Sequence, residues 1–166
     1  MSKGLSLLAA FASLAIGYTT NRSQVLSFSQ LSLGSIANAE VAVTPFVLKS
    51  LDGKDFNLAD SLGKKTIVLN FWAAWCTTCE EEIPELKALK NKHPEFLYVG
   101  INSGEKDSKA RRFVEKNNYP YFVVLDPEKT TANSYKVVGL PTTIIIGKNK
   151  NIIFRGSRPP ETISNK

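Results

Sequence analysis

From Val41 onward, apolar and polar positions alternate between short strand-like runs and amphipathic stretches. The run Thr66–Trp72 is β-branched and aromatic and shows little alternation, which is typical of a central strand covered on both faces. In the stretch Cys76–Lys92, apolar residues recur every three positions over 83–89, which predicts a helix. Pro84 lies inside that stretch and should kink the helix.

The other segments are interpreted in the same way. The Asp52-Gly53 pair marks a tight turn, so the flanking segments Pro45–Lys49 and Lys54–Asn57 are expected to pair as a hairpin. Further strands are expected at Phe96–Ile101, Phe122–Leu125, Thr142–Ile146 and Ile152–Arg155, and further helices at Ser108–Asn117 and Lys129–Tyr135. This order of elements predicts an α/β fold with a mixed central β-sheet flanked by helices.

The first 39 residues differ from everything that follows. They hold no acidic residue, two basic residues and eight serines. Lys3 followed by the apolar run Leu5–Ile16 is typical of a secretory signal, and Ala37-Asn38-Ala39 supplies a cleavage pattern. We therefore expect a targeting segment over residues 1–39 and one folded domain over residues 40–166.

Three interpretations of this leader stay open. It is a long cleaved signal, an uncleaved anchor that tethers the protein to a membrane, or a two-part organellar targeting sequence, and a plain N-terminal tail is the alternative to all three. The apolar run is shorter than the ~20 residues that a transmembrane helix needs, which disfavours stable anchoring. We expect export to the periplasm or an equivalent extracytoplasmic compartment. The alternatives are a membrane-anchored protein that faces that compartment and a protein of an organelle lumen.

Composition and charge exclude several classes of protein. A chain of 166 residues with 43% hydrophobic and 22% charged residues has room for one well-cored domain. The net charge of +6 is scattered, and the acidic run Glu80–Glu82 interrupts the basic pieces. It falls to +4 without residues 1–39, because that segment has two basic residues and no acidic one. A nucleic-acid-binding surface needs clustered basic residues with aromatic ones between them, so no nucleic-acid partner is expected.

The two cysteines, Cys76 and Cys79, lie where the expected buried strand has ended and the expected helix begins. Residues three apart on a helical turn face each other, so the sulfurs can form a disulfide. Because a helix N-terminus stabilises a thiolate, Cys76 is the expected nucleophile and Cys79 the resolving thiol. The alternative is a purely structural disulfide, but a bridge that closes so short a loop stabilises little.

Two other roles for the cysteines are disfavoured. A metal site needs three or four ligands, and the one histidine, His93, lies roughly 25 Å away at the far end of a seventeen-residue helix, where it should face solvent. A peroxidase would need a threonine three residues before the reactive cysteine, and Ala73 stands there. No metal and no cofactor are therefore expected.

Three motifs together carry a resemblance to a known family. They are the strand and cysteine pair Phe71–Cys79, the kinking segment Glu82–Pro84 and the segment Gly139–Thr143. Over about residues 44–156 the chain resembles the thioredoxin superfamily, particularly its TlpA-like branch of exported thiol-disulfide oxidoreductases, which includes cytochrome c maturation proteins. The resemblance implies a thioredoxin-like fold with an N-terminal β-hairpin extension and a central insertion, here 103–123.

The resemblance also implies roles for particular residues. Pro141 is the expected cis-proline opposite Cys76, and the backbone of Leu140 would pair with an extended client segment. Trp75, Leu140 and Pro141 thus form the expected client-binding surface. Glu82 matches a glutamate three residues after the second cysteine of similar reductants. It would accept the proton of Cys79, with a pKa raised by partial burial.

Three departures from the family accompany these matches. Asn70 stands where cytoplasmic thioredoxins have a buried aspartate. Glu80 and Glu81 are expected only to complement the helix dipole, whereas Glu105 lies in an acidic loop that similar proteins share and is a weaker candidate for a role. After Arg155 the chain has little or no room for the terminal helix of the family, so one sheet face is expected to be under-covered or covered by another chain.

These observations predict an exported thiol-disulfide oxidoreductase that reduces client protein disulfides through Cys76 and Cys79. The resemblance favours apocytochrome c as the client class and implies a membrane thiol-disulfide electron donor. A disulfide oxidase or isomerase of the same fold is the enzymatic alternative. The alternative from another class is a chaperone that binds clients or a metal at the groove by Pro141 without turnover.

Overall fold

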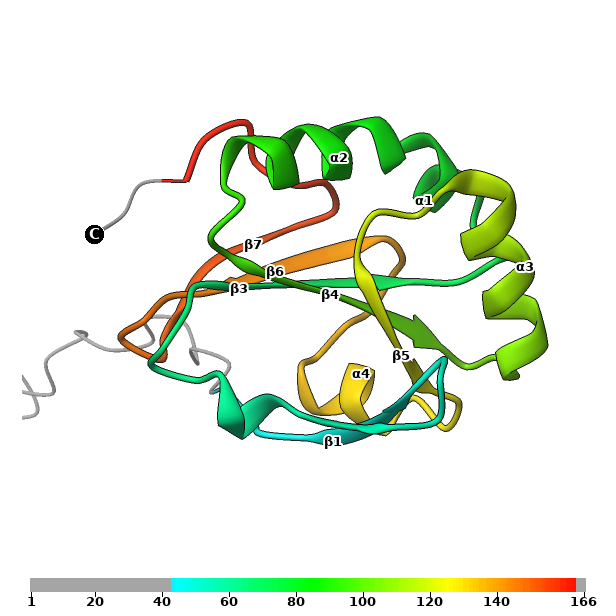
Figure 1. Ribbon diagram of the computed structural model, residues 1–166, viewed down its shortest axis with the longest axis horizontal. Coiled ribbons are helices and arrows are strands. Elements are labelled where there is room, and N and C mark those ends of the chain that lie inside the picture. Colours follow the sequence, from blue (N-terminus) through cyan, green and yellow to red (C-terminus); the bar gives the residue numbers. More distant parts are fainter. Residues whose placement is uncertain (1–42, 164–166) are drawn as a thin grey trace, which may run out of the picture. The chain divides into compact units, whose positions relative to one another are not determined.

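The computed structural model describes residues 43–163 (Figure 1), so the expected targeting segment 1–39 lies outside the described residues. A sheet of seven strands runs through this part of the chain in the order β2-β1-β5-β4-β3-β6-β7. The strands are β1 Val47–Ser50, β2 Asp55–Asn57, β3 Ile67–Trp72, β4 Leu97–Ser103, β5 Phe122–Asp126, β6 Thr142–Ile146 and β7 Ile152–Gly156. The strands β3, β4 and β5 are parallel, and the other pairings are antiparallel. The mixed sheet and the hairpin of β1 and β2 are as expected.

Helices cover both faces of the sheet (Figure 1). They are α1 Thr77–Glu81, α2 Ile83–Lys92, α3 Asp107–Asn117 and α4 Thr130–Ser134, with a 3-10 helix at Leu58–Asp60. The first three lie on one face, and α4 lies on the other (Figure 1). Because successive strand residues point to opposite faces, Trp72 packs into the core under α1, α2 and α3, whereas Phe71 packs into the core on the α4 side. Both side chains are fully buried, as the uninterrupted apolar run of β3 predicts.

The helix expected over Cys76–Lys92 is broken at Glu82 rather than merely kinked. Pro84 occupies the first turn of α2, where its missing N–H costs least. The chain therefore ends α1 at Glu81 and begins α2 at Ile83, with Glu82 between them. The position of the break gives one residue, Glu82, an environment that differs from that of the exposed Glu80 and Glu81.

The expectation that His93 faces solvent is wrong. Its side chain is only 16% exposed. The chain turns back after α2, with the N–H of Phe96 donating to the carbonyl of His93 at 3.2 Å. This reversal stacks the two rings at a centroid distance of 4.8 Å and an interplanar angle of 6°.

An irregular segment with several bends follows β7 within the described residues, and no helix occurs there. This segment, 157–163, runs beside α2 in Figure 1. Lys92 Nζ donates to the carbonyl of Glu161 at 2.9 Å, and Ile163 packs against the core under α2. The chain's own terminal segment thus covers part of the surface that we expected to find under-covered. None of the helices within 43–163 has the length and apolarity of a membrane span.

Gly100 in β4 packs closely against two buried rings beside the site. A Cβ atom at this position would lie 2.6 Å from Tyr119 Cε1 and 3.0 Å from Trp72 Nε1. We expect Gly100→Ala to lower the free energy of unfolding by about 1–3 kcal/mol, because the buried rings would have to move. Urea denaturation measures this loss. Gly139→Ala is the matched control, since its added Cβ would meet nothing within 4 Å, and equal losses in the two variants would contradict the packing explanation.

Candidate functional site

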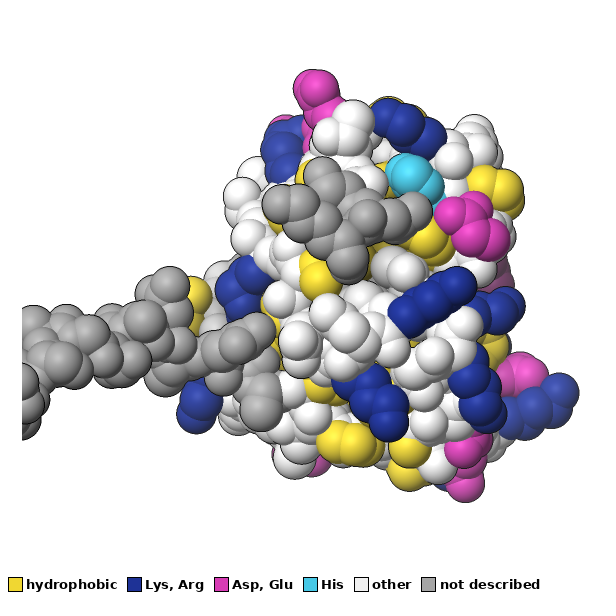
Figure 2. All heavy atoms as spheres, turned by 90° about the vertical axis from the view of Figure 1, so that its left-hand side faces the viewer, with side chains coloured by type: hydrophobic (Ala, Val, Ile, Leu, Met, Phe, Trp, Pro, Cys, Tyr) yellow, Lys and Arg dark blue, Asp and Glu magenta, His cyan; other side chains and the backbone are white. Residues whose placement is uncertain are grey.

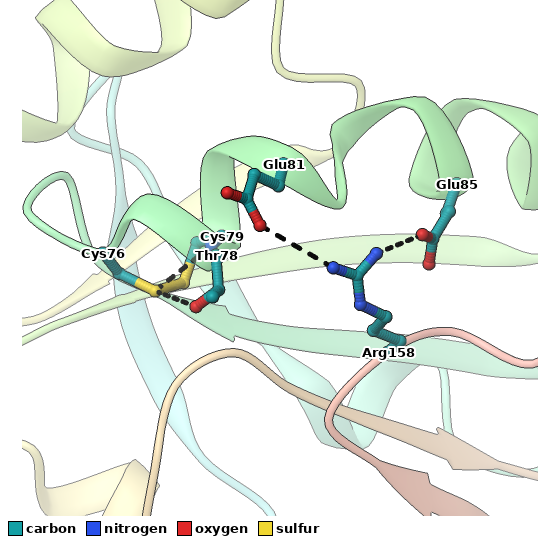
Figure 3. Close-up of polar contacts among 6 residues, drawn as sticks. All are labelled: Cys76, Thr78, Cys79, Glu81, Glu85 and Arg158. Carbon is teal, nitrogen blue, oxygen red and sulfur yellow. Dashed lines mark hydrogen bonds and ion pairs between the residues drawn. A yellow bond between two sulfur atoms is a disulfide. The ribbon is translucent and has the colours of Figure 1, made fainter.

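The two cysteines lie at the junction of β3 and α1. The strand ends at Trp72, three residues follow, and Cys76 is the N-cap of α1. Cys76 and Cys79 form a disulfide with a Cα–Cα distance of 5.3 Å (Figure 3). Cys76 is 5% exposed and Cys79 is 1% exposed. A chain with two cysteines thus has both of them in one disulfide, as their helical spacing predicts.

The sulfur of Cys76 has two polar neighbours (Figure 3). The backbone N–H of Cys79 donates to Sγ at 3.2 Å, and Thr78 Oγ1 lies 3.4 Å from the same atom. A disulfide sulfur carries no hydrogen, so the Thr78 hydroxyl is the donor in this pair. Both groups therefore direct hydrogen toward Cys76, an arrangement that stabilises negative charge on this sulfur.

Pro141 lies at the same end of the sheet. The pairing of β3 with β6 sets Phe71 opposite Thr142, so the residue before Thr142 lies at the edge where β3 ends. The peptide bond between Leu140 and Pro141 is cis, as expected. Pro141 is buried and Leu140 half-buried, and Leu140 contacts the cores on both sides of the sheet. Topology therefore brings the cysteine loop and the cis-proline to one edge.

Trp75, the third residue of the expected client-binding surface, precedes Cys76 directly. It is 66% exposed, more than the exposed aromatic residue Phe122 at 46%. Val138, three residues before Pro141, is also fully exposed. Exposed apolar side chains thus flank both the cysteines and the cis-proline along the sequence.

Glu82 is fully buried, although its two neighbours in sequence on the N-terminal side are exposed. Asn70 Nδ2 donates to its Oε1 at 2.9 Å. The other carboxyl oxygen, Oε2, is buried and has no hydrogen-bond partner among the described residues. Burial raises the pKa of Glu82 to about 7, and the hydrogen bond from Asn70 opposes this shift. At neutral pH this carboxyl can therefore both hold and release a proton.

A buried chain of hydrogen bonds orients Asn70. The hydroxyl of Tyr119 donates to Asn70 Oδ1 at 2.6 Å, which assigns the amide nitrogen to the side of Glu82. Asn70 Nδ2 also lies 3.2 Å from Thr143 Oγ1. The sequence patterns assign no role to Tyr119 or Thr143. The available signal was Asn70 itself, because a polar residue inside an otherwise apolar central strand needs buried partners.

Glu105 accepts a hydrogen bond from the backbone of the cysteine loop. Its Oε2 accepts the backbone N–H of Ala74 at 2.6 Å and Asn102 Nδ2 at 2.9 Å, and the residue is 7% exposed. The carboxyl therefore holds the backbone two residues before Cys76, rather than standing free in an acidic loop.

Ion pairs join the surface around the break between α1 and α2. Arg158 of the terminal segment reaches Glu81 on α1 at 3.8 Å and also pairs with Glu85 on α2 (Figure 3). Glu80 pairs with Lys116 of α3 at 3.2 Å. Both Glu80 and Glu81 thus have basic partners, in addition to their position near the start of α1. Within residues 43–163, no three His, Cys, Asp or Glu side chains lie together as a metal site would require.

The comparisons with known proteins agree on one family. A family model described as the AhpC/TSA family matches residues 40–155. The thiol-disulfide oxidoreductase ResA of Geobacillus kaustophilus is 34% identical over 155 residues, which cover 90% of this chain and 84% of that protein.

Solved structures share the fold of this chain. A secreted disulfide oxidoreductase of Mycobacterium tuberculosis, described as homologous to E. coli DsbE, has a TM-score of 0.62 and 26% identity, covering 72% of this chain and 88% of that one. The protein DsbF of MTB, solved in mixed oxidised and reduced forms, has a TM-score of 0.63 and 29% identity, covering 70% of this chain and 86% of that one.

Proposed function

Since this chain belongs to the AhpC/TSA family of thioredoxin-like proteins, in which it is a thiol-disulfide oxidoreductase, we propose that it reduces disulfides of client proteins through Cys76 and Cys79. The observation that carries the proposed thiol-disulfide exchange is the buried carboxyl of Glu82, three residues after Cys79 and so one helical turn from it. A base at this place assists the step in which a mixed disulfide is resolved.

In the first step the thiolate of Cys76 attacks one sulfur of the client disulfide. The client S–S bond breaks, a Cys76–client disulfide forms, and the second client sulfur leaves as a thiolate. The hydrogen bonds from Cys79 N–H and the Thr78 hydroxyl favour the thiolate form of Cys76. Trp75, Leu140 and Pro141 bind the client segment around the attacked cysteine, with the Leu140 backbone pairing to it.

In the second step Cys79 loses its proton to Glu82 and attacks the sulfur of Cys76. The Cys76–client bond breaks, the Cys76–Cys79 disulfide forms, and the client sulfur leaves as a thiolate that takes up a proton. Two electrons have then passed from the protein to the client. Because Glu82 has a pKa of about 7, it is ionised often enough at neutral pH to accept the proton of a buried thiol.

We further propose that the protein works outside the cytoplasm and that a membrane thiol-disulfide electron donor reduces it again. The leader over residues 1–39 supports export. The TlpA-like motifs support apocytochrome c as the client class. An oxidase or isomerase would use the same residues in the other direction, so the reduction potential decides between the two.

Trapping the client tests this function. In cells that carry Cys79→Ser, we expect Cys76 to remain joined to a client by a disulfide that a reducing agent releases, because no resolving thiol is left. The double variant Cys76→Ser/Cys79→Ser is the matched control and should trap nothing. The trapped protein identifies the client.

Equilibration of the wild type with a dithiol buffer supplies the second measurement. A reductant should have a potential nearer to about −270 mV than to about −120 mV, the values of thioredoxin and of a strong oxidant. Absence of a trapped partner together with no electron exchange would leave a client- or metal-binding chaperone as the better function, and an oxidising potential would favour the oxidase.

A further inference from the structure

A pocket of about 240 Å³ opens between α1 and α3, beside the cysteine loop. Ala74 and Glu80 line it from the side of the loop and α1, and α3 supplies three basic side chains, Lys109, Arg112 and Lys116. Their spacing of three and four residues sets these cations on one face of the helix. The side of the pocket that α3 forms, opposite the start of α1, is therefore positively charged.

The positive charge in this pocket is largely unpaired. Glu80 is the one acidic residue in the lining, and it pairs with Lys116 at 3.2 Å. Neither Lys109 nor Arg112 forms an ion pair with a described residue. By contrast Arg111, the neighbour of Arg112, bonds to Asp107 on its own helix. Two positive charges thus stay available to an anionic group.

Lysine and arginine side chains set the chemistry of the group that fits this pocket. Asn117 also lines it, but its Nδ2 atom is buried. A carboxylate matches the positive charge, because Lys and Arg form charge-assisted hydrogen bonds with carboxylate oxygens.

The pocket lies within reach of the reacting sulfur. Ala74 precedes Cys76 by two residues, and two residues of chain span at most about 7 Å. Glu105 holds the N–H of Ala74, so this wall of the pocket is fixed relative to the cysteine loop. An extended client rises about 3.3 Å per residue, so a side chain two to four residues from the attacked cysteine can reach the pocket.

We propose that this pocket binds an acidic side chain of the client, two to four residues from the cysteine that Cys76 attacks. The proposal rests on the proposed function and narrows its substrate class to disulfide proteins with Asp or Glu near the disulfide. The charges are exposed to solvent, so they act mainly on encounter and on the choice of client, and salt weakens them.

The test compares two peptides that each contain one Cys-x-x-Cys disulfide. One peptide has Asp three positions outside each cysteine, and the other has Asn at those positions. With reduced wild-type protein as the stoichiometric reductant, we expect the second-order rate constant of reduction to be about tenfold higher for the Asp peptide at low ionic strength. The preference should fall below about twofold in 0.5 M salt.

Two double variants test whether the preference for the Asp peptide comes from this pocket. Lys109→Gln/Arg112→Gln should reduce the two peptides at equal rates and keep the wild-type rate on the Asn peptide, because neither residue belongs to the redox machinery. Figure 2 shows that another face of the molecule also carries several Lys and Arg side chains, so a control for net charge is needed. Lys64→Gln/Lys65→Gln removes the same charge just before β3 begins, whereas the cysteines follow its other end, and it should keep the preference.

Each outcome separates this proposal from the function on which it rests. If the wild type reduces neither peptide, the proposed function fails. Equal rates on both peptides, with reduction intact, overturn the pocket alone. A preference that survives in Lys109→Gln/Arg112→Gln arises elsewhere on the protein and overturns the pocket. A preference that is lost equally in the Lys64→Gln/Lys65→Gln control depends on the net charge and also overturns the pocket.

Discussion

Replacing Cys76 by serine is expected to reduce disulfide exchange to less than about one thousandth of the wild-type rate. A serine hydroxyl does not displace a thiolate from a disulfide, so the first bond cannot form. Cys79 cannot take over, because it is 1% exposed and lies inside the first turn of α1. The donors that stabilise negative charge point at Cys76 Sγ and not at the second sulfur.

The contrast with Cys79→Ser makes this prediction specific. That variant should still form one covalent adduct with a peptide disulfide, seen by intact mass, but should not turn over. Both variants lose the disulfide equally, and a bridge across so short a loop stabilises little, so their urea midpoints should match that of the reduced wild type. If Cys76→Ser still forms the adduct, the assigned order of attack is wrong.

Replacing Glu82 by glutamine is expected to slow the resolution of the mixed disulfide about 10²-fold or more at pH 7. Glutamine keeps the shape of the side chain and an oxygen that can accept from Asn70 Nδ2, so the packing should survive. In the wild type the resolution rate should rise with pH through about 7, as Glu82 loses its proton, and the variant should lack this rise. Stopped-flow release of a thiol from a preformed adduct measures the step.

The same substitution should change how stability depends on pH. Burial raises the pKa of Glu82 from 4.5 to about 7 in the folded protein, so the folded state binds this proton more tightly than the unfolded state. The stabilisation from this group is complete below pH 4.5 and is lost as pH rises through about 7. The free energy of unfolding of the wild type relative to Glu82→Gln should therefore fall by about 3 kcal/mol over that window.

Glu80→Gln is the control for both measurements, because Glu80 is exposed and its pair with Lys116 lies at the surface. An exposed pair contributes about 0–1 kcal/mol, and its loss should alter neither the resolution rate nor the difference across pH 4.5 to 7. A Glu82→Gln variant with wild-type resolution kinetics would remove the carboxyl from the mechanism. The pH dependence of stability would then report burial alone.

Local patterns predicted the elements well and their ends less well. Three predictions correspond to elements of the structure: the apolar run before Trp72 to β3, the three-residue spacing after Ile83 to α2, and the Asp52-Gly53 turn to the hairpin of β1 and β2. Each of these patterns depends on residues that are neighbours in the chain. The thioredoxin-like fold was expected from the motifs, and solved structures at TM-scores of 0.62 and 0.63 confirm it. The break at Glu82 differed from the expected kink, because a proline in a first turn starts a new helix more readily than it bends an old one.

The sequence patterns did not predict side-chain environments that depend on residues far away in the chain. The stacking of His93 on Phe96 needs a chain reversal that no local signal announces. Tyr119 reaches Asn70 across 49 positions, and its ring fits because residue 100 lacks a side chain. Glu105 reaches Ala74 across 31 positions. Such contacts arise from strand pairing and helix docking rather than from spacing along the chain.

The amino-acid sequence by itself was enough to identify the redox pair and its chemistry, because two cysteines three residues apart at the start of a helix interact through local geometry alone. It also supplied Glu82 and Pro141 as candidates through the motifs. That Glu82 is buried against Asn70, and that Pro141 lies at the same sheet edge as the cysteine loop, depended on the packed sheet. The same holds for Lys109 and Arg112 beside Ala74. Burial and proximity across the sheet set pKa values and form pockets, and both are properties of the folded chain.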